Sequence, residues 1–225
     1  MGKLFVYGCS YTFGHGLPDC IADNGLDPGP IPSTQGWPNI ISKHTNRKIV
    51  NRGEPGGSNK QIAYRLLNNS PDITPDDAVI LQWTSPNRTI VLLKDDDRSN
   101  HPDGFKLGPW MTKKDLKTKM YYAHVQSDFD DVVMLSWYIN HTNLKLKSLG
   151  ITKILNITKG GSQFSDEHYG NILTQMVDND VLLHPITEGI ATHTVDNALD
   201  GQHPGPISNT NYGNFLIKLY GDYLT

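Results

Sequence analysis

The sequence predicts an α/β fold in which helices cover a parallel sheet, and three observations support this. Strand-like segments alternate with segments of helical periodicity along the 225 residues. The apolar run at residues 78–83 is typical of a strand buried on both faces. Residues 3–7 run directly into Gly8, as a buried strand does when the chain turns sharply at the carboxyl edge of a sheet. A chain of this length fits one domain, so residues 1–225 are predicted to form a single domain.

Helices are predicted where apolar residues recur every three or four positions. The first begins at Trp37-Pro38, and proline suits a first helical turn. Ser58 can cap the second, and Gly150 ends the third. These criteria place helices at residues 37–45, 59–69, 129–149, 168–176 and 211–224.

Further strands are predicted at residues 48–51, 152–157 and 181–184, each rich in β-branched or apolar residues. Residues 90–93 fit either a strand or a turn of helix. Residues 94–128 are polar and turn-rich with scattered aromatic side chains, which indicates an insertion. We expect this insertion to lie beside the mouth of the site and to set substrate choice, the alternative being a belt packed on the far side.

Composition excludes several classes of function. The net charge is −3, from 20 basic and 23 acidic residues, so no basic field for a nucleic-acid partner is expected. No apolar run approaches the roughly 18 residues that span a membrane. The first strand starts almost at the amino terminus, leaving no room for a secretory signal, and two cysteines do not make a disulfide framework. A cytoplasmic location is therefore predicted, with the oligomeric state left open.

Two segments far apart in the sequence carry the residues of a serine hydrolase. Ser10 follows the first strand, where open sheets bind ligands. Asp200 lies three residues before His203 in a turn rich in glycine and proline. A carboxylate so placed can accept a hydrogen bond from the histidine Nδ1, leaving Nε2 to take the serine proton. The alternatives are a capping serine and a solvent-exposed loop.

Two further turns could stabilise negative charge. Residues 51–58 offer backbone N–H groups beside the start of a helix. Asn87 follows the strand at residues 78–83 and carries a side-chain amide. Because these turns follow strands or precede the last helix, a doubly wound fold would bring them together at one edge.

These motifs resemble the four blocks of the SGNH (GDSL-like) hydrolase family. Gly8-Cys9-Ser10 is similar to the first block, with Cys9 where aspartate is usual. Residues 51–58 are similar to the second, residues 83–88 stand at the third, and residues 200–204 match the last, Asp-x-x-His-Pro. The resemblance implies a flavodoxin-like three-layer α/β/α sandwich with a five-stranded parallel sheet in the order 2-1-3-4-5. The first block also resembles phage-encoded relatives, which implies a virion-associated protein as an alternative to a cytoplasmic one.

The resemblance also assigns roles to residues. It implies a serine esterase that cleaves an acyl ester of a small molecule or glycan through an acyl-enzyme, without a metal or other cofactor. Ser10, Asp200 and His203 would be catalytic, and the N–H groups of Ser10 and Gly56, with Asn87, would bind the oxyanion. Tyr11, Trp83 and Arg88 are predicted to bind substrate because of their positions after strands; packing of Trp83 and a surface ion pair of Arg88 are the alternatives.

Three alternatives to this assignment are considered. The chain could be a non-catalytic carbohydrate-binding or virion structural protein with this fold, or an O-acyltransferase. A metal site of His184, His193 and His203 has no compact zinc spacing and is not predicted. His15 could contact substrate or be an ordinary loop residue. Trp110 could contact substrate or be a buried residue that anchors the insertion.

Overall fold

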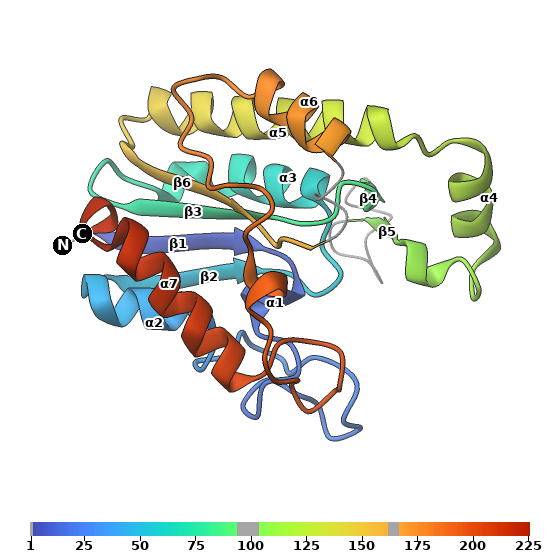
Figure 1. Ribbon diagram of the computed structural model, residues 1–225, viewed down its shortest axis with the longest axis horizontal. Helices are drawn as coiled ribbons and strands as arrows, with labels where there is room; N and C mark the ends of the chain where they lie inside the picture. The colour runs from blue at the N-terminus through green and yellow to red at the C-terminus, as the bar shows by residue number, and fades with distance from the viewer. Residues whose placement is uncertain (1, 94–103, 162–166) are drawn as a thin grey trace.

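A parallel sheet of four strands forms the middle of the computed structural model, which describes residues 2–93, 104–161 and 167–225 (Figure 1). The strands stand in the order β2, β1, β3, β6, and each neighbouring pair is parallel. Their bounds are β1 Lys3–Gly8, β2 Lys48–Gly53, β3 Ala78–Trp83 and β6 Lys153–Thr158. The predicted α/β class with a parallel sheet is confirmed. That the chain forms one domain stays a prediction.

Helices cover both faces of the sheet and give three layers (Figure 1). Helices α3, α5 and α6 pack on one face, and α2 and α7 pack on the other. Their bounds are α2 Trp37–Thr45, α3 Asn59–Asn69, α5 Asp128–Ser148, α6 Glu167–Met176 and α7 Pro206–Leu224. None of the helices in the described ranges is both long and apolar enough to cross a membrane.

The alternation of side chains along each strand explains the two apolar layers. Leu4 and Val6 of β1 pack under α2 and α7, whereas Phe5 and Tyr7 pack under α3 and α5. All four are buried, as are the six residues of β3. Because successive side chains of a strand point to opposite faces, a continuous apolar run is what a sheet covered on both sides requires.

The remaining elements are short. Residues 90–93 turn out to start a hairpin, in which β4 (Thr89–Val91) pairs antiparallel with β5 (Phe105–Leu107). The described part of the predicted insertion comprises β5, a 3-10 turn and α4, while residues 94–103 lie outside the described residues. The other short elements are α1 Ser10–Phe13, α4 Leu116–His124, η1 Ser70–Asp72, η3 Pro109–Met111 and η5 Ile190–His193.

The prediction of five strands is wrong, because the fifth is reduced to one bridge. Leu183 forms an isolated parallel bridge with Asn156 of β6. Among the described residues, two backbone hydrogen bonds support it: the Asn156 N–H donates to the Leu182 carbonyl (3.0 Å), and the His184 N–H donates to the Asn156 carbonyl (2.9 Å). Pro185 follows immediately and has no N–H to extend the ladder.

Helix α7 begins at Pro206, five residues before the predicted start at 211. A carboxylate distant in sequence explains the early start: Asp196 accepts hydrogen bonds from the N–H groups of Ile207 (3.0 Å) and Ser208 (2.8 Å). Pro206 at the first turn needs no such partner. The loop that carries Asp200 and His203 therefore runs straight into a capped helix.

A buried polar network lies between β3, β6 and α5. The Asn156 Oδ1 accepts hydrogen bonds from Trp83 Nε1 (3.0 Å) and Asn143 Nδ2 (3.2 Å). Its Nδ2 donates to Asn143 Oδ1 (3.1 Å) and to the Leu182 carbonyl (3.3 Å). Trp83 and Asn156 are fully buried, so each polar atom depends on these bonds.

We expect Asn156→Leu to lower the free energy of unfolding by about 2–4 kcal/mol, because it removes the Asn156 partners of Trp83 Nε1 and Asn143 Oδ1 in the core. Adding Trp83→Phe removes one orphaned donor, so the double variant should lose less than the sum of the two single losses. Urea denaturation of the three variants measures both effects. Additive losses would show that the network is not coupled.

Candidate active site

The turn after β1 holds Ser10 at the carboxyl edge of the sheet. A Cβ on Gly8 would lie 1.9 Å from Thr12 Oγ1, so only glycine fits there. Thr12 is fully buried, and its hydroxyl donates to Gln82 Oε1 of β3 at 2.6 Å. Ser10 is the first residue of α1 and is 6% exposed. The nucleophile candidate thus sits on a turn fixed to the neighbouring strand.

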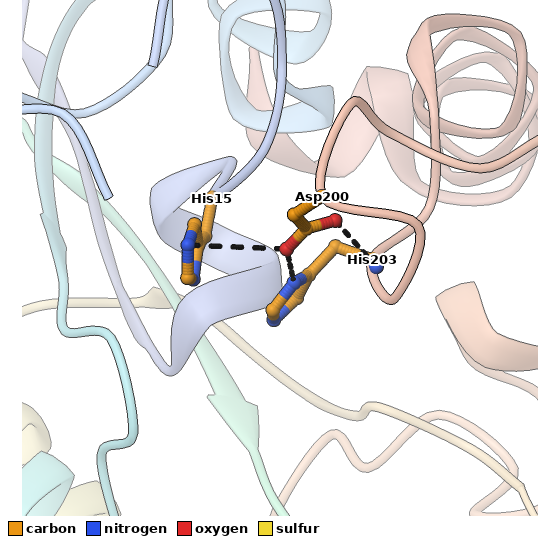
Figure 2. Close-up of side chains that lie close together, drawn as sticks. All are labelled: His15, Asp200 and His203. Carbon is orange, nitrogen blue, oxygen red and sulfur yellow. Dashed lines mark hydrogen bonds and ion pairs between the residues drawn. The ribbon is translucent and has the colours of Figure 1, made fainter. Parts of the chain in front are cut away.

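Asp200 and His203 lie in the loop before α7 and are joined by their own hydrogen bonds (Figure 2). Asp200 Oδ1 accepts the N–H groups of Gln202 (3.0 Å) and His203 (3.1 Å). Asp200 Oδ2 lies 2.5 Å from His203 Nδ1. Since an ionised carboxylate only accepts hydrogen bonds, His203 carries its proton on Nδ1, and Nε2 is left as an acceptor.

His203 Nε2 lies 2.9 Å from Ser10 Oγ, although the two residues are 193 positions apart. With the Nδ1 proton on the Asp200 side, the serine hydroxyl donates to Nε2. The structure therefore brings Ser10, His203 and Asp200 together in one hydrogen-bonded series, as their sequence positions predicted. Such a series makes a serine hydroxyl more nucleophilic.

The environment sets the protonation of this series. Burial alone would raise the pKa of Asp200, but hydrogen bonds from the Gln202 N–H and from His203 outweigh it and hold the pKa below its usual range. Burial lowers the pKa of His203, although the hydrogen bond and negative charge of Asp200 partly oppose this. At neutral pH the pair is thus an aspartate and a neutral imidazole, the forms that general base catalysis requires.

A second histidine lies against this pair. The His15 ring centre is 4.5 Å from that of His203, and its Nε2 is 3.8 Å from Asp200 Oδ2 (Figure 2). Gly16 has a φ of 84°, and a Cβ there would lie 2.7 Å from Asp200 Oδ1. Only glycine lets this turn approach the carboxylate so closely. The Gly16 carbonyl also accepts the Leu199 N–H (2.9 Å), which ties the two loops together.

Three of these side chains could share a metal ion. In the part of the chain that the structure describes, ligand atoms of His15, Asp200 and His203 lie within 4.8 Å of one another. Asp200 Oδ2, however, already accepts a hydrogen bond from His203 Nδ1, and a metal ion would have to replace it. The other two histidines considered for a metal site have different neighbours. His184 Nδ1 lies 2.8 Å from the Tyr220 hydroxyl, and His193 packs on Phe215. The arrangement of Asp200 and His203 thus favours proton transfer over metal binding.

A pocket of about 380 Å³ opens in front of Ser10. It is lined by Ser10, Tyr11, His15, Pro55, Gly56, Arg88, Trp110, Gln202 and His203. Five of these residues were predicted site residues. Tyr11 stands edge-on to His203 with ring centres 5.4 Å apart. Trp110 shows that part of the predicted insertion borders the mouth of the site.

Two backbone N–H groups that were predicted to bind the oxyanion belong to residues of the pocket. Within the described residues, neither the N–H of Ser10 nor that of Gly56 donates a hydrogen bond. Gly56 has a φ of 70° in the turn after β2, a conformation that glycine adopts without strain. Both residues line the pocket that opens in front of Ser10.

Three predicted site residues do not line the pocket: Asp200, which is hydrogen-bonded to His203, and Trp83 and Asn87. Trp83 is fully buried and donates to Asn156, so we assign it to the core rather than to substrate binding. The Asn87 carbonyl accepts a hydrogen bond from the Tyr122 hydroxyl (2.5 Å), and the buried Asn87 Oδ1 has no partner among the described residues. Strand periodicity could have shown that Trp83 points toward the helices rather than toward the edge of the sheet.

Other site residues were not predicted. Gln202 and Pro55 line the pocket, and each directly neighbours a predicted site residue or motif. Lys159 follows β6, and its Nζ lies 5.9 Å from the centre of the Tyr11 ring. The sequence could have indicated Lys159, because this residue closely follows a predicted strand, as Ser10 follows the first strand.

Comparisons with known proteins identify solved structures that have a similar fold. No protein-family model matches the sequence, and no curated protein sequence matches it. Similar solved structures include a protein from Desulfitobacterium hafniense DCB-2 described as a lipolytic protein of the G-D-S-L family. It has 12% identity and a TM-score of 0.53, and the match covers 97% of this chain and 99% of that one.

Two esterases are similar in the same way. A carbohydrate acetylesterase family member from Sinorhizobium meliloti has 13% identity and a TM-score of 0.53, covering 100% of this chain and 99% of that one. An acetyl xylan esterase from the rumen bacterium Butyrivibrio proteoclasticus has 16% identity and a TM-score of 0.58. That match covers 99% of this chain but 64% of the xylan esterase. Read with the four-stranded parallel sheet between two helical layers, these likenesses show that the chain has the fold of the SGNH (G-D-S-L) hydrolases.

Proposed function

We propose that this protein is a serine esterase that works through an acyl-enzyme. One observation carries the proposal: Ser10 Oγ lies 2.9 Å from His203 Nε2, while His203 Nδ1 lies 2.5 Å from Asp200. The nucleophile, the base and the group that orients the base are therefore within hydrogen-bond reach of one another. The pocket in front of Ser10 provides room for the reacting ester.

The reaction proceeds in two halves. Ser10 Oγ attacks the carbonyl carbon while His203 Nε2 takes the hydroxyl proton, and the carbonyl electrons move to oxygen. When the tetrahedral intermediate collapses, the bond to the alcohol breaks, and His203 returns the proton to the departing oxygen. Water then attacks the acyl-enzyme with His203 again as base, releasing the acid and restoring Ser10. Asp200 stabilises the imidazolium formed in each half.

The N–H groups of Ser10 and Gly56 are the proposed oxyanion donors. Both border the pocket and lack another partner in the described residues. Each such donor is commonly worth about 3 kcal/mol because it is already aimed where negative charge develops. Asn87 is left out of this set, since it does not line the pocket.

The proposed substrate is an acyl ester of a carbohydrate or another small molecule. Carbohydrate acetylesterases are among the proteins with this fold, and two aromatic side chains, Tyr11 and Trp110, border the pocket. Aromatic faces commonly pack against sugars through their apolar surface. A phage source, a cytoplasmic or virion location and the absence of nucleic-acid partners stay predictions.

We expect Ser10→Ala to abolish labelling by a fluorophosphonate probe and to lower hydrolysis of p-nitrophenyl acetate by about 10⁴-fold or more. Ser148→Ala, which changes an exposed helical serine, is the matched control. A folded wild-type protein that neither reacts with the probe nor hydrolyses the ester would instead support a non-catalytic binding protein. Transfer of acetyl to an added sugar in preference to water would support an acyltransferase.

The pH profile tests the role of His203. Only neutral His203 can act as base, so activity is present above its pKa and is lost as the pH falls through it. Because burial lowers this pKa, the acid limb of kcat/KM should have its midpoint below the ordinary value of about 6.5. His15→Gln should move the midpoint upward, since a positive charge on His15 opposes protonation of His203. A midpoint above about 6.5 in the wild type would contradict the assignment.

Asn87→Ala distinguishes the proposed oxyanion donors from the predicted one. We expect kcat on p-nitrophenyl acetate to change by less than about threefold, whereas loss of an oxyanion donor costs about 10²–10³-fold. Steady-state kinetics on a variant with an unchanged circular dichroism spectrum decides the point. A hundredfold loss would restore Asn87 to the oxyanion site.

A further inference from the structure

The carboxyl ends of β3 and β6 each lead to a cationic side chain near Ser10. Arg88 lies in the turn after β3 and lines the pocket together with Ser10 and His203. Lys159 is the residue directly after β6, and its Nζ lies 5.9 Å from the centre of the Tyr11 ring, which also borders the pocket. Both cations therefore lie at the edge of the sheet where the proposed chemistry takes place.

The acidic groups around the pocket do not neutralise these cations. Within the described residues, neither Arg88 nor Lys159 forms an ion pair with a carboxylate. Glu54 is already bound by Arg65 (2.8 Å) and Lys106 (2.7 Å), and Asp200 is engaged by His203.

Asp130 and Asp131 also lie near Arg88. They border, with it, a separate pocket of about 200 Å³, and neither is paired with it. The main pocket therefore keeps a positive charge that the described side chains leave unbalanced.

This pair of cations is unfavourable without an anion. Lys159 is half-buried, and burial together with the charge of Arg88 lowers its pKa. Like charges placed together in a partly buried site repel each other and lose hydration. An anion bound between or beside them would relieve both costs.

Trp110 fixes the arginine at the wall of the pocket. The Arg88 Cζ lies 4.7 Å from the centre of the Trp110 ring, and Trp110 is half-exposed. Stacking on an aromatic face holds the planar guanidinium in one orientation and leaves its edge N–H groups available. Such an edge matches the two oxygens of a carboxylate or a phosphate.

We propose that Arg88, supported by Lys159, binds a negatively charged carboxylate or phosphate group on the ester substrate. The proposal rests on the esterase function and narrows its substrate class to anionic esters. The pocket of about 380 Å³ is large enough to hold a small ester and a charged substituent together. Arg88 is thus a specificity-determining residue for the reaction at Ser10.

Three acetate esters test the proposal: methyl 4-acetoxybenzoate is neutral, 4-acetoxybenzoate carries a carboxylate, and 4-acetoxyphenyl phosphate carries a phosphate. The measured quantity is the ratio of kcat/KM for each anionic ester to that for the neutral one. We expect Arg88→Gln to lower this ratio by about 10–100-fold, because a charge-assisted hydrogen bond is worth about 1.5–3 kcal/mol. Intrinsic ester reactivities cancel when variants are compared.

Matched variants complete the experiment. Lys159→Met should lower the ratio by about threefold or more, by the loss of one nearby charge. Arg52→Gln removes an exposed arginine from the end of β2 that does not line the pocket, and it should leave the ratio unchanged. The anionic ester whose ratio falls more in Arg88→Gln identifies carboxylate or phosphate as the natural group.

The possible failures are distinguishable. A folded wild-type protein that hydrolyses none of the three esters contradicts the esterase function. Hydrolysis of all three, with a ratio that Arg88→Gln does not change, overturns the anion site alone. Should Arg88→Gln not fold, inhibition of wild-type p-nitrophenyl acetate hydrolysis replaces it: benzoate or phenyl phosphate should inhibit at least about tenfold better than benzamide. Equal inhibition overturns the proposal.

Discussion

The hydrogen bond between Thr12 and Gln82 fixes the turn on which the candidate active site is built. It joins the turn after β1 to β3, its neighbour in the sheet, and the Asn51 side chain donates to the Thr12 carbonyl (2.8 Å) from β2 on the other side. The turn is therefore held from both flanking strands, at a point where Gly8 leaves room for the threonine hydroxyl. Three strands of the sheet therefore fix the position of Ser10.

The other half of the site is held more locally. Asp200 organises its own loop by accepting two backbone N–H groups and the His203 ring, and Asp196 fixes the start of the helix that follows. Gly16 then brings the loop after α1 against Asp200. The charged groups differ in a similar way: Glu54 and Asp200 are paired with neighbouring side chains, whereas the cations after β3 and β6 have no carboxylate partner among the described residues. The site thus combines a neutral base, a shielded carboxylate and a positively charged wall.

The sequence was sufficient for those features that depend on a single segment. The buried run at residues 78–83 and the glycine after the first strand predicted the sheet and the place of Ser10. Asp200 and His203 were predictable because their hydrogen bonds lie within one short loop. Features set by distant partners were missed: the start of α7 depends on Asp196, and the fifth strand stops at one bridge before Pro185. For Trp83 the sequence left both substrate binding and packing open, because its hydrogen-bond partner, Asn156, comes from another strand. Lys159 belongs to no recognisable motif. It comes to the same edge as Arg88 because β6 and β3 are neighbouring strands of the sheet.

The 193 positions between Ser10 and His203 have a consequence for the chain as it is being made. A domain emerging from the ribosome presents its amino-terminal strand first, and β1 cannot be flanked on both sides until β3 has followed. Throughout that time Ser10 is an ordinary alcohol, since the base that would activate it has not been synthesised. Contacts of such long range form late, because the entropy of closing the intervening chain must be overcome first. The reactivity proposed for Ser10 would therefore appear only late in folding, when the segments that carry Ser10 and His203 have come together.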